Sequence, residues 1–128
     1  MTAPHWLSAA EASRAFAART LSPVELMTAL LARIETLEPK LHAFIRLDAD
    51  AAMAAAKQAE AEIAARRIRG PLHGVPVGIK VNVDQAGLPT TNGTVAFADL
   101  VAAEDAPVVA NLRAAGAVIV GRTNMTEF

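Results

Sequence analysis

A single cation interrupts an apolar run in the second half of the chain. The stretch GVPVGIKVNVDQAGLPTTNG, residues 74–93, alternates valine, isoleucine and glycine around Lys80. A strand of this composition is ordinarily buried, and a buried lysine is costly unless it is paired, deprotonated or able to extend its ammonium to water. A deprotonated amine could accept a proton, so Lys80 is the first candidate for chemistry.

Polar residues near two apolar runs are candidates for contact with a small molecule. Thr90 and Thr91 lie in the segment GLPTTNG, where turn formation explains them equally well. Asn124 and Met125 follow the run AVIVGR, which is typical of a strand buried on both faces. Ligand loops of α/β proteins lie at the carboxyl ends of such strands. We therefore include all four residues as candidate substrate contacts.

The residue inventory does not indicate a metal or a cofactor. The sequence has no cysteine, and its three histidines lack the spacing of metal ligands. No G-x-G-x-x-G motif occurs, so we expect no nicotinamide cofactor. His73 could be read as a general base, but it has no partner nearby in the sequence, and we favour a packed structural histidine.

Composition narrows the class of protein. The 128 residues carry 12 basic and 13 acidic side chains, which disfavours nucleic acid as a direct ligand. No apolar stretch of about 20 residues and no leader pattern occur, so a cytoplasmic protein without membrane contact is expected. A hydrophobic content of 53% is high for so small a chain. This apolar content predicts that part of the surface contacts further sequence or another subunit. Self-association into a homo-oligomer is one of the alternatives.

Two capping boxes predict two helices near the N-terminus. The motif SAAE places Ser8 at an N-cap and Glu11 three residues later. The motif SPVE does the same with Ser22 and Glu25, and adds Pro23 at the favoured first helical position. One apolar face of the second helix follows at helical spacing: Leu26, Leu30, Ile34, Leu37 and Leu41.

A short strand and a third helix are predicted next. Pro39 indicates that the second helix ends near Glu38. The segment HAFIRL, residues 42–47, reads as a short strand. Asp48 can then cap an alanine-rich helix that runs to about Arg67.

The second half of the chain changes character after Gly70-Pro71. A strand is predicted from Val75 to Val83, and Asp105 is expected to cap a further helix with Pro107 in its first turn. The side chains of Val108, Leu112 and Ala115 are expected to face the core. Gly116 is expected to cap the C-terminal end of this helix. The strand AVIVGR follows, so helices followed by strands with helical crossovers predict an α/β fold.

Three segments carry a resemblance to a known family. GPLHGVPVGIKVNVDQAGLPTTNGT, followed after a short gap by EDAPVVANLRAAGAVIVGRTNMTEF, is similar to the opening part of the amidase signature family, the Ser-Ser-Lys amidohydrolases. SPVELMTALLARIETLEPKLHAF is similar to the N-terminal helical region of that family. The resemblance implies the N-terminal part of a single amidase domain over residues 1–128. Residues 1–69 are expected to be mainly helical, and residues 70–128 to form part of a mixed sheet flanked by helices.

The resemblance also implies a role for Lys80. In this family the matching lysine is the terminal base of a proton relay that runs through a cis-configured serine to a nucleophilic serine. An ammonium enclosed by an apolar sheet is disfavoured, which would suit a neutral amine that accepts a proton. The chain departs from the family pattern in that Val81 stands where aspartate is frequent, Thr94 where serine is usual and Arg122 where lysine is common.

One part of the family pattern is absent from this sequence. The glycine- and serine-rich segment that provides both serines should follow TNMTEF, and the sequence stops at Phe128. The three serines present, Ser8, Ser13 and Ser22, lie at helix starts and have a capping explanation. We therefore expect a fragment that carries the base without the nucleophile and is inactive alone.

Three functions stay open at this point. The first is an amidase that cleaves the C–N bond of a small carboxamide through an acyl-enzyme, once the missing C-terminal portion is present. The second is the amidase subunit of a tRNA-dependent amidotransferase, which would need partner subunits. The third is a non-catalytic α/β binding or scaffold module.

Overall fold

The computed structural model describes residues 2–128. The α-helices of this part of the chain are α1 (Ala9–Ala18), α2 (Pro23–Leu41), α3 (Ala49–Ala64) and α4 (Pro107–Ala114). The strands are β1 (Phe44–Leu47), β2 (Pro76–Lys80) and β3 (Val118–Thr123). Two short 3-10 helices are η1 (Pro4–Trp6) and η2 (Val95–Phe97).

β3 is the central strand of a mixed sheet with the order β1-β3-β2. β1 runs antiparallel to β3, and β2 runs parallel to it. Because a parallel pair cannot be joined by a hairpin, the chain crosses from the end of β2 through α4 to the start of β3. The predicted α/β fold is therefore confirmed.

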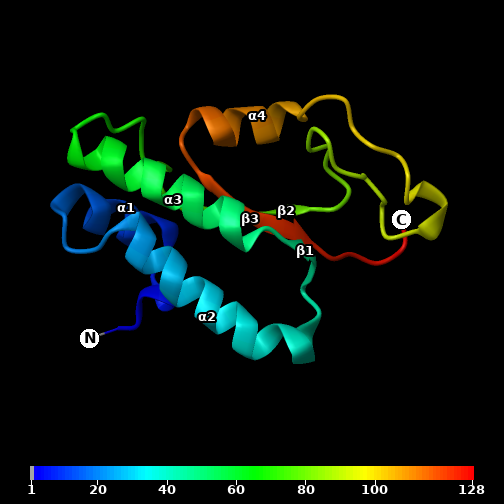
Figure 1. Cartoon of the computed structure of the whole chain (residues 1–128), viewed down its shortest axis with the longest axis horizontal. Helices are drawn as coiled ribbons and strands as arrows, with labels where there is room; N and C mark the ends of the chain where they lie inside the picture. The colour runs from blue at the N-terminus through cyan, green and yellow to red at the C-terminus, as the bar shows by residue number, and fades with distance from the viewer. Residues whose placement is uncertain (1) are drawn as a thin grey trace.

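α3 lies along β3 with α2 beside it, and α4 is drawn apart from them at the top of the view (Figure 1). The core between these elements joins Met27 of α2, Ala52 and Ala56 of α3, and Val118 and Val120 of β3. The facing side of α3 carries only alanine at these positions, so the helix can approach the strand closely and leave no void. Packing thus accounts for part of the alanine-rich composition.

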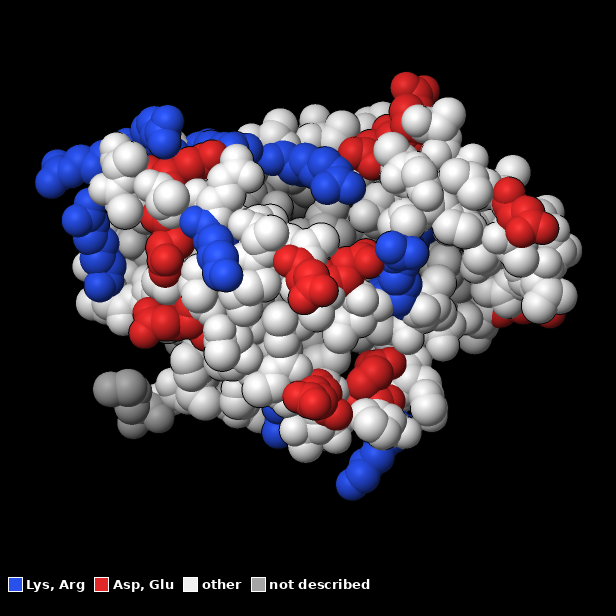
Figure 2. Space-filling view, viewed as in Figure 1, with Lys and Arg blue, Asp and Glu red and all other residues white. Residues whose placement is uncertain are grey.

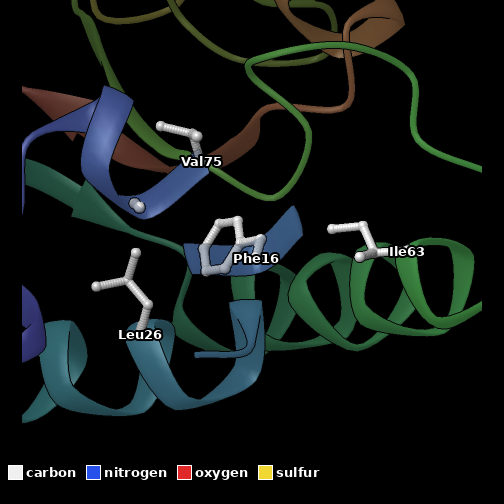
Figure 3. Close-up of a cluster of buried hydrophobic side chains, with 5 residues drawn as sticks. Phe16, Leu26, Ile63 and Val75 are labelled. Carbon is white, nitrogen blue, oxygen red and sulfur yellow. The ribbon is translucent and has the colours of Figure 1, made fainter. Parts of the chain in front are cut away.

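A second apolar cluster joins the first three helices to the start of β2 (Figure 3). Phe16 of α1, Leu26 of α2 and Ile63 of α3 pack with Val75, the residue immediately before β2. Burying side chains of this size contributes about 1.5–3 kcal/mol each. The cluster therefore ties the helical layer to the strand that ends in Lys80.

Both predicted capping boxes are present. The hydroxyl oxygens of Ser8 and Ser22 accept the backbone N–H groups of Glu11 and Glu25. The two glutamate side chains accept the backbone N–H groups of the serines in return. These local signals are confirmed because each capping box needs only four neighbouring residues.

α2 extends further than Pro39 predicts. The helix runs to Leu41, and His42 then adopts the left-handed conformation with its N–H bonded to the carbonyl of Glu38. A proline near the end of a helix removes one intrahelical hydrogen bond, and the residues after it still form the last turn. The predicted end near Glu38 is therefore wrong.

α3 also differs from the prediction at both ends. It ends at Ala64 rather than near Arg67. Its side-chain cap is absent, because Asp48 Oδ1 instead accepts the Nε–H of Arg46 at 2.8 Å. Asp48 thus occupies the N-cap position but joins the helix to β1 through an ion pair.

The cap of α4 is Ala106 rather than Asp105. Asp105 accepts the backbone N–H of Ala86 and the Nε–H of Arg113, each at 2.8 Å. The hydrogen bond from Ala86, followed by that from Arg113, holds the pKa of Asp105 below its usual range. The aspartate therefore connects α4 to the loop after β2.

The buried face of α4 and the extent of β2 also differ from the prediction. Val109 is fully buried, whereas the predicted inward residue Val108 is 54% exposed. Gly116 has a φ of 80° just after the helix, as the cap prediction requires. The strand predicted from Val75 to Val83 is limited to Pro76–Lys80, because the chain turns directly after Lys80.

His73 holds the connection between α3 and β2. It is 3% exposed, its Nδ1 accepts the backbone N–H of Arg69 at 3.1 Å, and its Nε2 lies 3.0 Å from a carboxylate oxygen of Glu62. Because Nδ1 is an acceptor, the neutral ring carries its proton on Nε2, toward Glu62. The favoured reading as a packed histidine is consistent with this complete set of partners.

The environments of His73 and Glu62 predict that the stability of the fold depends on pH. Burial lowers the pKa of His73 below its usual 6.5, against the opposing effect of Glu62. Hydrogen bonds from Arg69 and Gln58 lower the pKa of Glu62 to about 2. As the pH falls below 6.5, the unfolded chain therefore binds protons at His73 more readily than the folded chain does, and below 4.5 the same becomes true of Glu62.

We expect the melting temperature of the full-length protein to fall as the pH is lowered from 7 to 5.5, through His73. His73→Asn should remove most of that dependence. His42→Asn is the matched control, because His42 is exposed and asparagine tolerates its left-handed conformation. Thermal melts of the three proteins across this range make the comparison, and an equal slope in His73→Asn would contradict the assignment.

Both outer strands of the sheet have a free edge in the part of the chain described. β1 and β2 each pair only with β3. None of the described helices has both the length and the apolar character that crossing a bilayer requires. Apolar side chains are exposed in and beside β1, in the loop after β2 and at the end of the chain: Leu41, Ile45, Leu47, Leu100, Val101 and Phe128. Free edges beside apolar side chains favour association.

The isolated 128-residue chain should therefore be largely helical by circular dichroism and should associate at micromolar concentration. Sedimentation velocity over a dilution series measures this directly. A cooperative, stable monomer at every concentration would contradict the expectation.

Candidate functional site

Lys80 is the last residue of β2 and lies at the carboxyl end of the sheet. It pairs with Thr123, the last residue of β3, so the two parallel strands end together. The N–H of Val81 donates to the carbonyl of Thr123 at 3.1 Å, and the N–H of Val83 donates to the carbonyl of Lys80 at 3.0 Å. The main chain around the lysine is thus held by the neighbouring strand and by its own turn.

The prediction that an apolar sheet encloses Lys80 is wrong for the described residues. Lys80 is exposed, whereas Ile79 and Val81 on either side of it are buried. The physical reason is the face on which it lies, since successive side chains of a strand point to opposite faces and Ile79 shares the buried face with Arg122. Among residues 2–128 no carboxylate forms an ion pair with it.

Asn124 and Met125 lie at the same end of the sheet as Lys80. They directly follow β3, as the strand-end argument predicts. The side-chain amide of Asn124 donates to the carbonyl of His42 at 3.2 Å, and its Oδ1 accepts the N–H of Met125 at 2.9 Å. Asn124 thus supports the chain that leaves the sheet, and contact with a substrate stays a prediction for both residues.

Thr90 and Thr91 have structural partners in the loop after β2. Thr90 is 6% exposed, and its hydroxyl donates to Asp84 Oδ1 at 2.6 Å. The hydroxyl of Thr91 accepts the N–H of Gly93 at 3.3 Å in a turn. Both contacts fit the turn-forming alternative, and substrate contact by either threonine remains a prediction.

The loop after Thr91 packs against the last residues of the chain. The N–H of Phe128 donates to the carbonyl of Asn92 at 2.9 Å, and the rings of Phe97 and Phe128 meet edge to face at 5.8 Å. Figure 1 shows the C-terminus beside η2. The segments after β2 and after β3 therefore lie together at the end of the sheet that carries Lys80.

Arg122 is the buried cation of this region. It is 1% exposed, and one of its terminal nitrogens, Nη2, donates to the carbonyl of Val83 at 2.8 Å. Its Nε and Nη1 are buried and have no hydrogen-bond partner among residues 2–128. Burial lowers the pKa of Arg122, and the nearby carboxylate of Asp84 opposes that effect.

Sequence reasoning did not predict the burial of Arg122 or the bond between Thr90 and Asp84. A signal for Arg122 was present, because it ends an apolar run that is typical of a doubly buried strand. The same kind of run singled out Lys80 as a buried cation. The order and register of the strands distinguish them, because Arg122 lies on the central strand and Lys80 lies on the opposite face at the end of an outer strand.

A second group of charged side chains lines a cavity between α3 and α4, away from Lys80. On the face in Figure 2, Lys and Arg gather at one end, over the α1 and α3 termini, and a hollow lies near the middle. A cavity of about 200 Å³ between α3 and α4 is lined by Glu62, Arg69, His73 and Arg113, among others. His73 precedes β2 and Lys80 ends it, so this cavity is at the other end of the strand.

Gly93 tests whether the packing of the two segments depends on a glycine. Its φ is 73°, and a Cβ there would lie 2.6 Å from the carbonyl oxygen of Thr126. Gly87 is a matched control with a φ of 78° and nothing within 4 Å of its Cβ position. Both alanine variants carry a backbone cost of about 1–2 kcal/mol, and Gly93→Ala also has a steric clash.

We expect Gly93→Ala to speed hydrogen exchange in the peptide that contains Phe128, whereas Gly87→Ala leaves that peptide unchanged. Exchange measured by mass spectrometry on the full-length protein reports this local opening. Equal protection of the peptide in both variants would show that packing of the last residues against this loop does not depend on the close approach of Gly93 to Thr126.

Comparison with known proteins bears on this arrangement. A family model described as Amidase matches residues 25–128. The A subunit of glutamyl-tRNA(Gln) amidotransferase from Chloroflexus aurantiacus is 43% identical over 128 residues, which are 100% of this chain and 26% of that protein.

Solved structures agree with the sequence match. The peptide amidase of Stenotrophomonas maltophilia is 36% identical with a TM-score of 0.85, over 95% of this chain and 25% of that one. A bacterial aryl acylamidase of the amidase signature enzymes is 27% identical with a TM-score of 0.87, over 98% of this chain and 26% of that one. The chain spans about a quarter of the length of each relative. It belongs to the amidase signature family.

Proposed function

We propose that this chain is the N-terminal part of an amidase domain that hydrolyses the C–N bond of a carboxamide, with Lys80 as the base. The observation that carries the proposal is the position of Lys80. It is exposed at the carboxyl end of two parallel strands, beside the loops that follow both of them. Ligands of open α/β sheets bind at this edge.

The chemistry proposed for Lys80 is proton acceptance. A neutral amine takes the proton of a serine hydroxyl through a second serine, while the nucleophilic oxygen bonds to the amide carbon. The C–N bond then breaks, and the leaving amine takes that proton. Water hydrolyses the resulting acyl-enzyme by the reverse proton path.

The nucleophile is proposed to lie outside these 128 residues. Ser8 and Ser22 accept backbone hydrogen bonds at the starts of α1 and α2, and Ser13 lies within α1. All three belong to the helical half, whereas Lys80 ends a strand of the other half. Coverage of about a quarter of each relative leaves ample sequence for both serines.

Lys80→Arg in the full-length protein tests the base. Arginine keeps the positive charge but cannot lose its proton in the working range. We expect Lys80→Arg and Lys80→Ala to lose turnover of a simple amide by about 10²- to 10⁴-fold. Lys57→Arg is the matched control, because Lys57 is exposed on α3, and it should keep normal turnover.

Steady-state kinetics of these variants test whether Lys80 acts as a base. Near-normal turnover in Lys80→Arg would mean that the residue acts only through its charge, and the base assignment would be wrong. The isolated chain should show no hydrolysis at any concentration, since it lacks the proposed nucleophile.

A tRNA-dependent amidotransferase, with this chain in its amidase subunit, is the second candidate. It is favoured by the 43% identity to the A subunit of glutamyl-tRNA(Gln) amidotransferase over the whole chain. Purification of the full-length protein from its source distinguishes the two. Co-purifying subunits and amide hydrolysis that depends on glutamyl-tRNA would favour the amidotransferase, whereas hydrolysis by the purified protein without partners would favour the amidase. A protein without either activity would favour the non-catalytic alternative.

A further inference from the structure

The burial of Arg122 calls for a physical explanation. Removing a guanidinium from water is expensive, and such groups are ordinarily paired with a carboxylate. The carboxylate of Asp84 is nearby but forms no ion pair with it, and Arg122 donates instead to the backbone carbonyl of Val83, while two more of its nitrogens are buried without a partner among residues 2–128. A methionine would fill a similar space without this desolvation cost, so filling space does not explain an arginine.

The acceptor of Arg122 identifies what the side chain holds. Val83 closes the turn that starts at Lys80, since its N–H donates to the carbonyl of Lys80 at 3.0 Å. Val81, inside this turn, donates its N–H to the carbonyl of Thr123 at 3.1 Å. β3 therefore holds the turn at two points, through the backbone of Thr123 and through the side chain of Arg122.

The register of the sheet keeps Arg122 off the face that carries the lysine. Ile79 pairs with Arg122, and Lys80 pairs with Thr123. Successive side chains of a strand point to opposite faces, so Lys80 and Arg122 lie on opposite sides of the sheet. Arg122 thus reaches Lys80 through the main chain of the turn.

We propose that Arg122 is a positioning residue for the amidase reaction, which clamps the turn Lys80–Val83 to β3 and thereby places the amine of Lys80. The inference rests on the proposed function of Lys80. Displacement of a catalytic group by about 1 Å can cost on the order of 10²-fold in rate. A rigid turn on the central strand limits such displacement better than a free strand end does.

The test uses Arg122→Met, Arg122→Lys and the control Arg14→Met in the full-length protein. Methionine lacks the donor, lysine retains one, and Arg14 is exposed on α1. We expect Arg122→Met to lower kcat by about 10- to 100-fold with little change in KM. Arg122→Lys should recover most of kcat, because its ammonium can donate to the same carbonyl, and Arg14→Met should match the unmodified protein.

Hydrogen exchange separates positioning from a general loss of stability. In Arg122→Met the peptide with Val81 and Val83 should exchange faster, while the peptides of α3 keep their protection. Unchanged kcat in Arg122→Met would overturn the inference. So would uniformly faster exchange in β3 and α3 with a lower melting temperature, because the residue would then be merely structural.

Two further variants keep the outcome clear. If Arg122→Met does not fold, Arg122→Gln replaces it, because its amide is polar but too short to span the same distance, and the same loss of kcat is expected. Lys80→Arg is measured in parallel. Normal turnover in Lys80→Arg refutes the proposed function, whereas an inactive Lys80→Arg with a fully active Arg122→Met refutes only the positioning role.

Discussion

The parallel pairing of β2 with β3 is the constraint on which the rest of the structure depends. It requires a crossover, and the chain between the strands supplies α4 and the loop with Thr90 and Thr91. It also brings the carboxyl ends of both strands to one edge. Lys80, Asn124 and Met125 come together for this reason, although more than forty residues separate Lys80 from the other two in the sequence.

The helical layer makes this pairing stable. α3 presents alanines to β3, and the cluster around Phe16 holds the residue before β2. The ring of His73, in the loop before β2, packs against Gly116, just before β3. A Cβ on Gly116 would lie 2.5 Å from Cδ2 of the ring. The turn before β3 and the loop before β2 are therefore packed together, and Gly74 adds an N–H bond to the carbonyl of Gly116 at 2.9 Å.

Local signals predicted the elements better than their surroundings. The capping boxes at Ser8 and Ser22 depend on neighbouring residues, and both are present. Asp48 and Asp105 also resemble caps, yet neither caps its helix. The carboxylate of Asp48 accepts the Nε–H of Arg46, and that of Asp105 accepts the N–H of Ala86 and the Nε–H of Arg113. The capping pattern takes no account of such competing donors, whether they are two residues away, as Arg46 is, or further along the chain, as Ala86 and Arg113 are. The buried face of α4, with Val109 in place of Val108, depends on tertiary packing in the same way.

The two cations that follow the apolar runs, Lys80 and Arg122, show the same limit at the candidate site. Lys80 and Arg122 each follow a run that is typical of a buried strand. Arg122 lies on the face of β3 whose residues Val118 and Val120 pack against the helices, whereas Lys80 lies on the other face at the end of β2, where it is exposed among residues 2–128. Composition alone assigns both the same environment, whereas the register of the sheet places them on opposite faces. The amine of Lys80 is exposed at the carboxyl end of the two parallel strands, and the buried guanidinium of Arg122 donates to the carbonyl of Val83 in the turn that starts at Lys80.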